Sequence, residues 1–152
     1  MKTGERPENF ALTNTEGEKV SLHDLIENQK VLLLFFPFAF SDVCTGEMCT
    51  MRDNMKMYNS LDANVVGISV DSFFSLRAFK KANNLNFILL SDFNKEVSRQ
   101  FNCLYDDYFG AKGVSKRSAF VINQEGIIEY SEILDDSDKL PDFKGIYQAL
   151  KS

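Results

Sequence analysis

The amino-acid sequence predicts an α/β fold in which a central mixed β-sheet is flanked by helices. Apolar runs of strand length alternate along the chain with segments in which apolar residues recur every three or four positions. This alternation is typical of parallel strands joined by helices, whereas two later apolar runs at residues 118–131, separated by a short turn, indicate an antiparallel hairpin. Both strand directions together make the predicted sheet mixed.

Composition and charge favour a single domain over residues 1–152 that has no nucleic-acid partner. The chain is 44% hydrophobic and 26% charged, and it has no internal repeat, low-complexity tract or Gly/Ser-rich linker. Seventeen Lys and Arg against 22 Asp and Glu give a net charge of -5. A negative surface does not favour contact with nucleic-acid phosphates.

The hydropathy pattern predicts neither a membrane span nor a secretory leader. The longest apolar run, residues 31–40, has ten residues and contains Pro37, whereas a spanning helix needs about 20. The first ten residues are polar and charged. We therefore expect a cytoplasmic protein that does not bind membranes.

The first predicted elements are short. A turn around Gly17 indicates an N-terminal β-hairpin extension, and Ser21 with Asp24 fits a capping box that opens one turn of helix. Residues 31–36 are continuously apolar, as expected of a central strand covered on both faces, and Pro37 ends that strand.

One long helix is predicted from residue 41 or 42 to about residue 60. Five residues in this segment recur at intervals of three and four, which places them on one face of a helix. They are Cys44, Met48, Met51, Met55 and Tyr58.

The remaining segments continue the alternation in an order like that of the thioredoxin-like fold. A helix capped by Asp71 or Ser72 is predicted to end near residues 83–84. Pro141 fits the first turn of a closing helix. The other predicted elements are strands at 65–70, 87–90, 118–122 and 127–131 and a helix at 95–101. The inward residues of the closing helix are Phe143, Ile146 and Leu150.

Cys44 is a candidate nucleophile because of its position. It lies in the first turn of a helix that directly follows a central strand. Unpaired amides and the positive end of the helix dipole favour a thiolate over a thiol there. The alternative is a small buried hydrophobic residue, and position alone favours neither interpretation.

Other cysteine chemistries find little support in the sequence. The only histidine, His23, lies inside the predicted capping box, which makes it a poor base for a cysteine hydrolase. A redox-active Cys-x-x-Cys pair would need a second cysteine where Glu47 stands. The close ligand pairs of a zinc site are missing. We therefore expect no metal and no organic cofactor.

The segment FFPFAFSDVCTGEMCTMRD resembles the peroxiredoxins. Its Pro37-x-x-x-Ser41-x-x-Cys44 matches the signature Pro-x-x-x-(Thr/Ser)-x-x-Cys. Residues 7–12, residues 89–92 and the strand opened by Arg117 also agree, so that the resemblance covers nearly the whole chain.

Two groups within the family fit different parts of this segment. The context Ala39-Phe40-Ser41 is similar to the AhpE-like group, whereas Cys49 stands at the spacing of the resolving cysteine in the PrxQ-like group. The sequence therefore fits both the AhpE-like and the PrxQ-like group.

The resemblance implies a thiol-dependent peroxidase acting on hydrogen peroxide or small organic hydroperoxides. Cys44 would attack the hydroperoxide and become a sulfenic acid. Arg117 would hold the thiolate and a peroxide oxygen, and Ser41 would bond to the peroxide. Pro37 would close one side of the pocket.

Two further residues take supporting roles by the same resemblance. Backbone amides near Val43 and Cys44 would stabilise the departing oxygen, and Glu47 would position Arg117. Each of three residues also has an alternative interpretation without a role in catalysis. Arg117 could be a surface arginine, Ser41 an ordinary N-cap and Glu47 a solvated carboxylate.

Cys49 is the predicted resolving cysteine, although an intact helix forbids its bond to Cys44. Five residues along an α-helix separate the two Cα atoms by about 8.6 Å and turn the side chains about 140° apart. Disulfides need Cα atoms within about 7 Å, so the first turns would have to unwind, and Gly46 weakens them. Alternatively, Cys49 is a bystander and an external thiol resolves the sulfenic acid. Cys103 has no motif and is expected to be structural.

Five aromatic residues have two open interpretations, a pocket for organic hydroperoxides or a contact in a homodimer. They are Phe38, Phe40, Tyr105, Tyr108 and Phe109. The expected electron donor is thioredoxin or a similar thiol reductant. A glutathione-peroxidase-like protein is disfavoured, because the pocket of that family relies on a tryptophan and this chain has none. The competing function is a non-enzymatic redox sensor or holdase, which would stop after one equivalent of peroxide.

Overall fold

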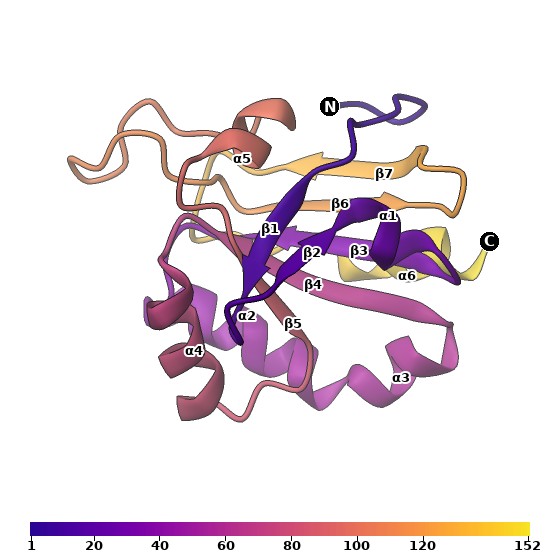
Figure 1. Ribbon diagram of the computed structural model, residues 1–152, viewed down its shortest axis with the longest axis horizontal. Coiled ribbons are helices and arrows are strands. Elements are labelled where there is room, and N and C mark those ends of the chain that lie inside the picture. Colours follow the sequence, from indigo (N-terminus) through magenta and orange to yellow (C-terminus); the bar gives the residue numbers. More distant parts are fainter.

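The computed structural model describes residues 1–152 and contains a seven-stranded sheet with the order β2-β1-β5-β4-β3-β6-β7 (Figure 1). The strands are β1 (Ala11–Asn14), β2 (Lys19–Ser21), β3 (Lys30–Phe35), β4 (Ala63–Ser69), β5 (Ile88–Ser91), β6 (Ser118–Ile122) and β7 (Ile128–Ile133). The helices are α1 (Leu22–Ile26), α2 (Asp42–Asp53), α3 (Met55–Ser60), α4 (Phe73–Ala82), α5 (Glu96–Gln100) and α6 (Phe143–Lys151). Strand β4 is parallel to β3 and β5, and the other pairs are antiparallel. The predicted mixed α/β sheet is confirmed.

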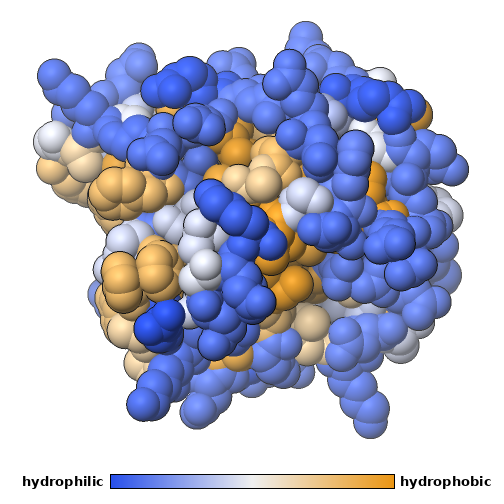
Figure 2. Space-filling view, in the orientation of Figure 1, coloured by the Kyte–Doolittle hydropathy of each residue, from blue (hydrophilic) through white to orange (hydrophobic).

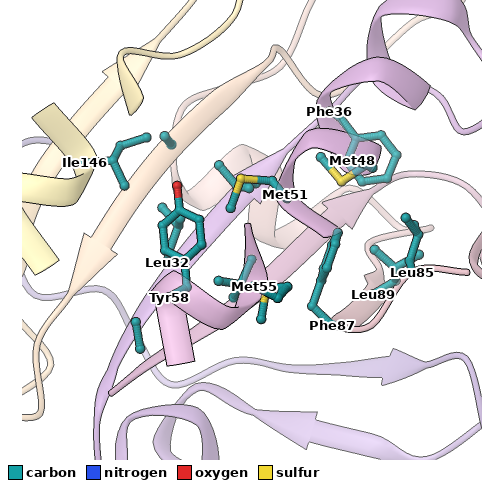
Figure 3. Packing of buried hydrophobic residues seen from close by; sticks show 14 of the residues in the cluster. Leu32, Phe36, Met48, Met51, Met55, Tyr58, Leu85, Phe87, Leu89 and Ile146 are labelled. Atoms are coloured by element: carbon teal, nitrogen blue, oxygen red, sulfur yellow. The ribbon is translucent and has the colours of Figure 1, made fainter. Parts of the chain in front are cut away.

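Hydrophobic cores cover both faces of the sheet because β3 is apolar on both sides. Leu32 and Leu34 belong to a core with residues of α2, α3, α4 and α6, which Figure 3 shows in close-up. Val31, Leu33 and Phe35 belong to a second core with residues of α1, α5 and β1. Alternate side chains of a strand point to opposite faces, so one continuous apolar run supplies both cores.

The predicted helix over residues 41–60 is two helices, and that expectation is wrong. The chain breaks at Asn54, whose φ of -108° and ψ of 7° are not helical. The predicted stripe of Cys44, Met48, Met51, Met55 and Tyr58 is nevertheless buried along its whole length. Figure 3 shows its last four residues in the core. Apolar periodicity was a signal of burial here, and it continued across the break because α3 packs on the same core.

Local capping signals were mostly accurate. Ser21 and Asp24 form the predicted capping box at the start of α1, and β1 with β2 forms the predicted hairpin. Ser72 caps α4. Pro141 precedes α6 instead of lying in its first turn, because Asp142 is the N-cap. The other predicted elements occur within a few residues of their expected bounds.

The strand register brings the ends of distant segments together. Phe35, the last residue of β3, pairs with Ser118, the first residue of β6. Arg117 therefore lies beside the carboxyl end of β3, from which the chain turns into α2. Ligands of open α/β sheets bind at this edge.

The surface is largely hydrophilic on the face that Figure 2 shows, and hydrophobic residues gather in part along the edge where α4 and the loop before β6 lie. None of the helices combines the length and the apolar character needed to cross a membrane. The exposed large hydrophobic residues are Phe40, Met57, Phe74, Phe93, Phe109 and Leu140.

Candidate active site

The turn between β3 and α2 is held by a residue from the neighbouring strand connection. The amide of Ala39 donates to Asp71 Oδ2 at 2.8 Å, and Ser69 Oγ donates to the same oxygen at 2.7 Å. Phe40 has a φ of 70°, an uncommon left-handed conformation for a bulky side chain. Burial raises the pKa of Asp71, although these hydrogen bonds oppose that change. Asp71 thus anchors the turn that delivers the chain into α2.

Helix α2 begins with amides that are not bonded within the helix. The first backbone hydrogen bond of its N-terminus runs from Thr45 to Ser41 O at 2.9 Å, after the amides of Val43 and Cys44. Ser41 is the N-cap, but its hydroxyl donates to Phe38 O at 2.9 Å and does not cap the helix. Free amides at a helix start attract negative charge, and the Cys44 side chain lies there with 1% of its surface exposed.

Arg117 reaches the sulfur of Cys44. Its Nη2 lies 3.2 Å from Cys44 Sγ, although 73 residues separate the two positions. The side chain is 1% exposed, so the interpretation of Arg117 as a surface arginine is wrong. Burial lowers the pKa of Arg117, but the neighbouring Glu47 and Cys44 together raise it by more than burial lowers it. The pKa of Arg117 is therefore above its ordinary value, and the guanidinium stays protonated. A permanent cation at this distance favours the thiolate form of a cysteine.

Glu47 holds the opposite edge of the guanidinium. Arg117 Nη1 donates to Glu47 Oε1 at 2.5 Å, and the Glu47 side chain is completely buried. The interpretation of Glu47 as a solvated carboxylate is therefore wrong. Its second oxygen, Oε2, is buried with no hydrogen-bond partner. Burial raises the pKa of Glu47 to about 7, and Arg117 counteracts only part of that rise.

A main-chain carbonyl supplies the third contact of Arg117, and sequence reasoning missed it. Ser137 O, in the loop after β7, accepts hydrogen bonds from Arg117 Nε at 3.3 Å and from Nη2 at 3.1 Å. Two acceptors and the sulfur thereby determine the plane of the guanidinium. A main-chain carbonyl cannot be recognised from a sequence, and residues 135–138 form an acidic run that carries no motif.

The other predicted site residues lie around the same helix start. Pro37 is buried two residues after the end of β3, and Val43 is half-buried in the first turn of α2. Ser41 lies three residues before Cys44, although its hydroxyl is bonded to the backbone. The sequence signature and the sheet register therefore converge on one location.

Cys49 and Cys103 occupy different environments from Cys44. All three cysteines are free, and helix α2 is continuous from Cys44 to Cys49. Cys49 Sγ lies half-buried, 3.7 Å from Asn83 Oδ1 at the end of α4. Cys103 is buried in the second core, where burial raises its pKa to about 12, in keeping with the structural role expected of it.

Four of the five aromatic residues lie together near the site. The rings of Phe38 and Tyr108 are 6.1 Å apart, and Tyr108 contacts the rings of Tyr105 at 4.9 Å and Phe109 at 4.8 Å. Phe40 instead contacts Phe79 at 5.2 Å. Phe109 is 92% exposed, so this group forms a rim and not an enclosed pocket.

Comparison with known proteins gives a consistent result. Residues 3–131 match the AhpC/TSA family. The chain is 36% identical over 138 residues to "Peroxiredoxin Bcp" of Escherichia coli, covering 90% of this chain and 86% of that protein. It is 35% identical over 130 residues to "2-Cys peroxiredoxin BAS1, chloroplastic" of Spinacia oleracea, covering 81% of this chain but only about half, 48%, of that relative. The structure of "Peroxidoxin BcpB" from Mycobacterium tuberculosis superposes with a TM-score of 0.89 at 28% identity, covering 99% of this chain and 97% of that one. The Bcp relatives support the PrxQ-like side of the resemblance, and the likeness to the AhpE-like group stays a prediction.

Proposed function

The chain belongs to the AhpC/TSA family and is a peroxiredoxin with a thioredoxin-like fold, and we propose that Cys44 is the sulfur that reduces the hydroperoxide. One observation carries this assignment. The sulfur lies at the start of α2, 3.2 Å from a buried guanidinium. Both the helix start and the cation stabilise a thiolate, the nucleophilic form of cysteine.

The proposed reaction begins with attack of the Cys44 thiolate on one oxygen of the hydroperoxide. A sulfur–oxygen bond forms while the oxygen–oxygen bond breaks, and the sulfur is oxidised by two electrons to a sulfenic acid. The other oxygen leaves and takes a proton, to give water or an alcohol. Negative charge therefore shifts from sulfur to the departing oxygen during the step.

Arg117 and the helix start are suited to that shift of charge. Arg117 Nη2 already bonds to the sulfur and can contact an oxygen bound beside it. The free amides of Val43 and Cys44 offer further donors. Ser41 would rotate its hydroxyl from Phe38 O to the peroxide, and Pro37 would shield the sulfur from water.

We further propose that Cys49 resolves the sulfenic acid. The Cys49 thiolate would displace the hydroxyl from Cys44 sulfur, which forms the disulfide and releases water. Because α2 is continuous between the two cysteines, its first turns must unwind before the sulfurs can meet. Glu47 lies between the two cysteines in the sequence, so unwinding of this part of α2 would also break the hydrogen bond from Arg117 to Glu47. A dithiol reductant such as thioredoxin would restore both thiols by exchange, in the cytosol.

The test combines peroxide consumption with excess dithiothreitol and, in a separate sample without reductant, mass spectrometry of the protein after one equivalent of peroxide. Cys44→Ser should abolish turnover, because an alcohol is a much weaker nucleophile near neutral pH. Cys103→Ser is the matched control, since Cys103 lies in the other core, and it should turn over normally. Turnover by Cys44→Ser would overturn the assignment, and wild-type consumption that stops after one equivalent would favour a sensor.

The same spectra test the resolving role. The wild-type protein should contain a disulfide between Cys44 and Cys49, and Cys49→Ser should accumulate sulfenic or sulfinic acid at Cys44. If the wild-type protein without reductant instead shows no such disulfide and accumulates the same oxidised Cys44 as Cys49→Ser, Cys49 is a bystander and an external thiol resolves the sulfenic acid.

A further inference from the structure

Two tyrosines before β6 have no role in the reaction described above. They belong to the segment of residues 104–116, which extends beyond the sheet between α5 and β6 (Figure 1). The segment folds back on itself, since Tyr105 N donates to Val114 O and Tyr108 N donates to Ala111 O, each at 2.8 Å. The rings of Tyr105 and Tyr108 stack with centroids 4.9 Å apart and planes inclined by 21°. We refer to these two residues as the tyrosine pair.

Both hydroxyls of the tyrosine pair bond to the loop that follows β7. Tyr105 OH donates to Asp135 O at 2.7 Å, and Tyr108 OH donates to Ser137 Oγ at 3.1 Å. Burial and the neighbouring Tyr108 raise the pKa of Tyr105, so its hydroxyl keeps its proton as a donor near neutral pH. Lys116 adds an ion pair to Asp135 at 2.7 Å.

The loop held in this way supplies the carbonyl that orients Arg117. Ser137 O accepts two hydrogen bonds from the guanidinium, whose Nη2 also bonds to Cys44 sulfur. Asp135, Asp136 and Asp138 of the same loop are exposed, so packing does little to hold its backbone. The loop has a few hydrogen bonds of its own, from Lys139 N to Asp136 O and from Asp138 N to Asp136 Oδ1, and Leu134 N donates to Arg117 O. The side-chain contacts from outside the loop come from Lys116 and from the tyrosine pair, which provides two of them.

Tyr108 also contacts the other side of the site. Its ring lies 6.1 Å from the ring of Phe38, in the turn before α2, and Phe38 O accepts the hydroxyl hydrogen of Ser41. Tyr108 thus touches both the loop that orients Arg117 and the turn that places the start of α2.

We propose that the tyrosine pair positions Arg117 for its reaction role by holding the Ser137 carbonyl against the guanidinium. The hydroxyls of the pair bond to the loop and not to the sulfur, so the pair acts through Ser137. Without the two hydroxyls, the guanidinium would spend less time in contact with Cys44. Both the thiolate fraction and the rate of attack on peroxide would then fall. This inference rests on the proposed function of Cys44.

The test compares the wild-type protein with Tyr105→Phe, Tyr108→Phe and the double variant, which remove the hydroxyls but keep the rings. Tyr147→Phe is the matched control, because Tyr147 is half-buried on α6 and its hydroxyl makes no hydrogen bond to the loop. Alkylation of Cys44 by iodoacetamide, measured by mass spectrometry of its peptide across pH, reports the thiolate fraction. Stopped-flow mixing with hydrogen peroxide reports the rate constant, and thermal unfolding reports stability.

The double variant should react with peroxide about tenfold more slowly at pH 7, since small misplacements of a reacting group cost one or two orders of magnitude. Its alkylation profile should move to higher pH, and each single variant should show part of both effects. Tyr147→Phe should match the wild type. An alkylation profile that stays unmoved in the double variant would overturn the inference, whether the rate and the stability change or not.

A parallel sample of Cys44→Ser separates this inference from the proposed function. If Cys44→Ser still reacts with peroxide at the wild-type rate, the assignment of Cys44 fails, and the role of the tyrosine pair fails with it. If Cys44→Ser is inert and the double variant behaves as the wild type, only the role of the tyrosine pair is overturned.

Discussion

Replacing Glu47 by glutamine should remove a pH dependence of stability that the site creates. Glu47 is completely buried, one of its oxygens bonds to Arg117, and the other has no partner. Burial raises its pKa from 4.5 to about 7 in the folded protein. The protonated form is therefore favoured in the native state relative to the unfolded chain. A glutamine keeps an oxygen for Arg117 and is neutral at every pH.

The sign and size follow from proton linkage. Between pH 4.5 and about 7 the unfolded chain has lost this proton while the folded protein keeps it, so raising the pH favours unfolding. The stabilisation is fully present below pH 4.5 and is lost as the pH rises through about 7. Each pKa unit corresponds to about 1.4 kcal/mol, which gives a loss of roughly 3 kcal/mol across the interval. Above about pH 7 the buried carboxylate therefore lowers the stability of the fold while it holds Arg117.

Urea unfolding at a series of pH values from about 4.5 to 8 measures this effect. The Glu47→Gln variant and its parent should both carry Cys44→Ser, so that the thiol bonded to Arg117 is absent from both proteins. The advantage of Glu47→Gln in free energy of unfolding should grow by about 3 kcal/mol with rising pH. Glu16→Gln, at an exposed position in the N-terminal hairpin, is the control and should show no such growth. A constant difference between Glu47→Gln and its parent would refute the reasoning.

Two further predictions concern the guanidinium and the contact between α2 and the sheet. Arg117→Lys should lower the rate of peroxide reduction about 100-fold in stopped-flow assays, because an ammonium cannot bond to Glu47, Ser137 and the sulfur in one plane; a rate within a factor of about three of wild type would contradict this. Gly67→Ala should lower the free energy of unfolding by about 1–2 kcal/mol, because the new Cβ would lie 2.7 Å from Leu89 Cδ2 and 3.3 Å from Phe36 Cε1, with Met48 Sδ of α2 in contact at 3.5 Å, in a filled core. Urea denaturation checks the second prediction, and an unchanged midpoint would show that Leu89 moves aside freely.

Local sequence signals were sufficient for most of the fold. The apolar run of β3, the capping box at Ser21 and the buried stripe from Cys44 to Tyr58 each depend on neighbours within a few positions. The break at Asn54 was not predictable in this way, because the periodicity of apolar residues continues through it. The signature around Cys44 likewise marked the start of α2, because all of its residues lie within one short segment of the chain.

The environment of Cys44 was decided by tertiary structure. Pairing of β3 with β6 brings Arg117 to the sulfur, and burial changes Glu47 from an ordinary helix carboxylate into a fixed partner of Arg117. The contacts of Ser137 and Asp71 arise from loops that meet only in the folded chain. By itself the sequence determined which segments form strands and helices and which cysteine begins a helix, since these depend on short-range pattern. Which charges surround that cysteine depends on strand register and burial, and these exist only once the whole sheet has assembled.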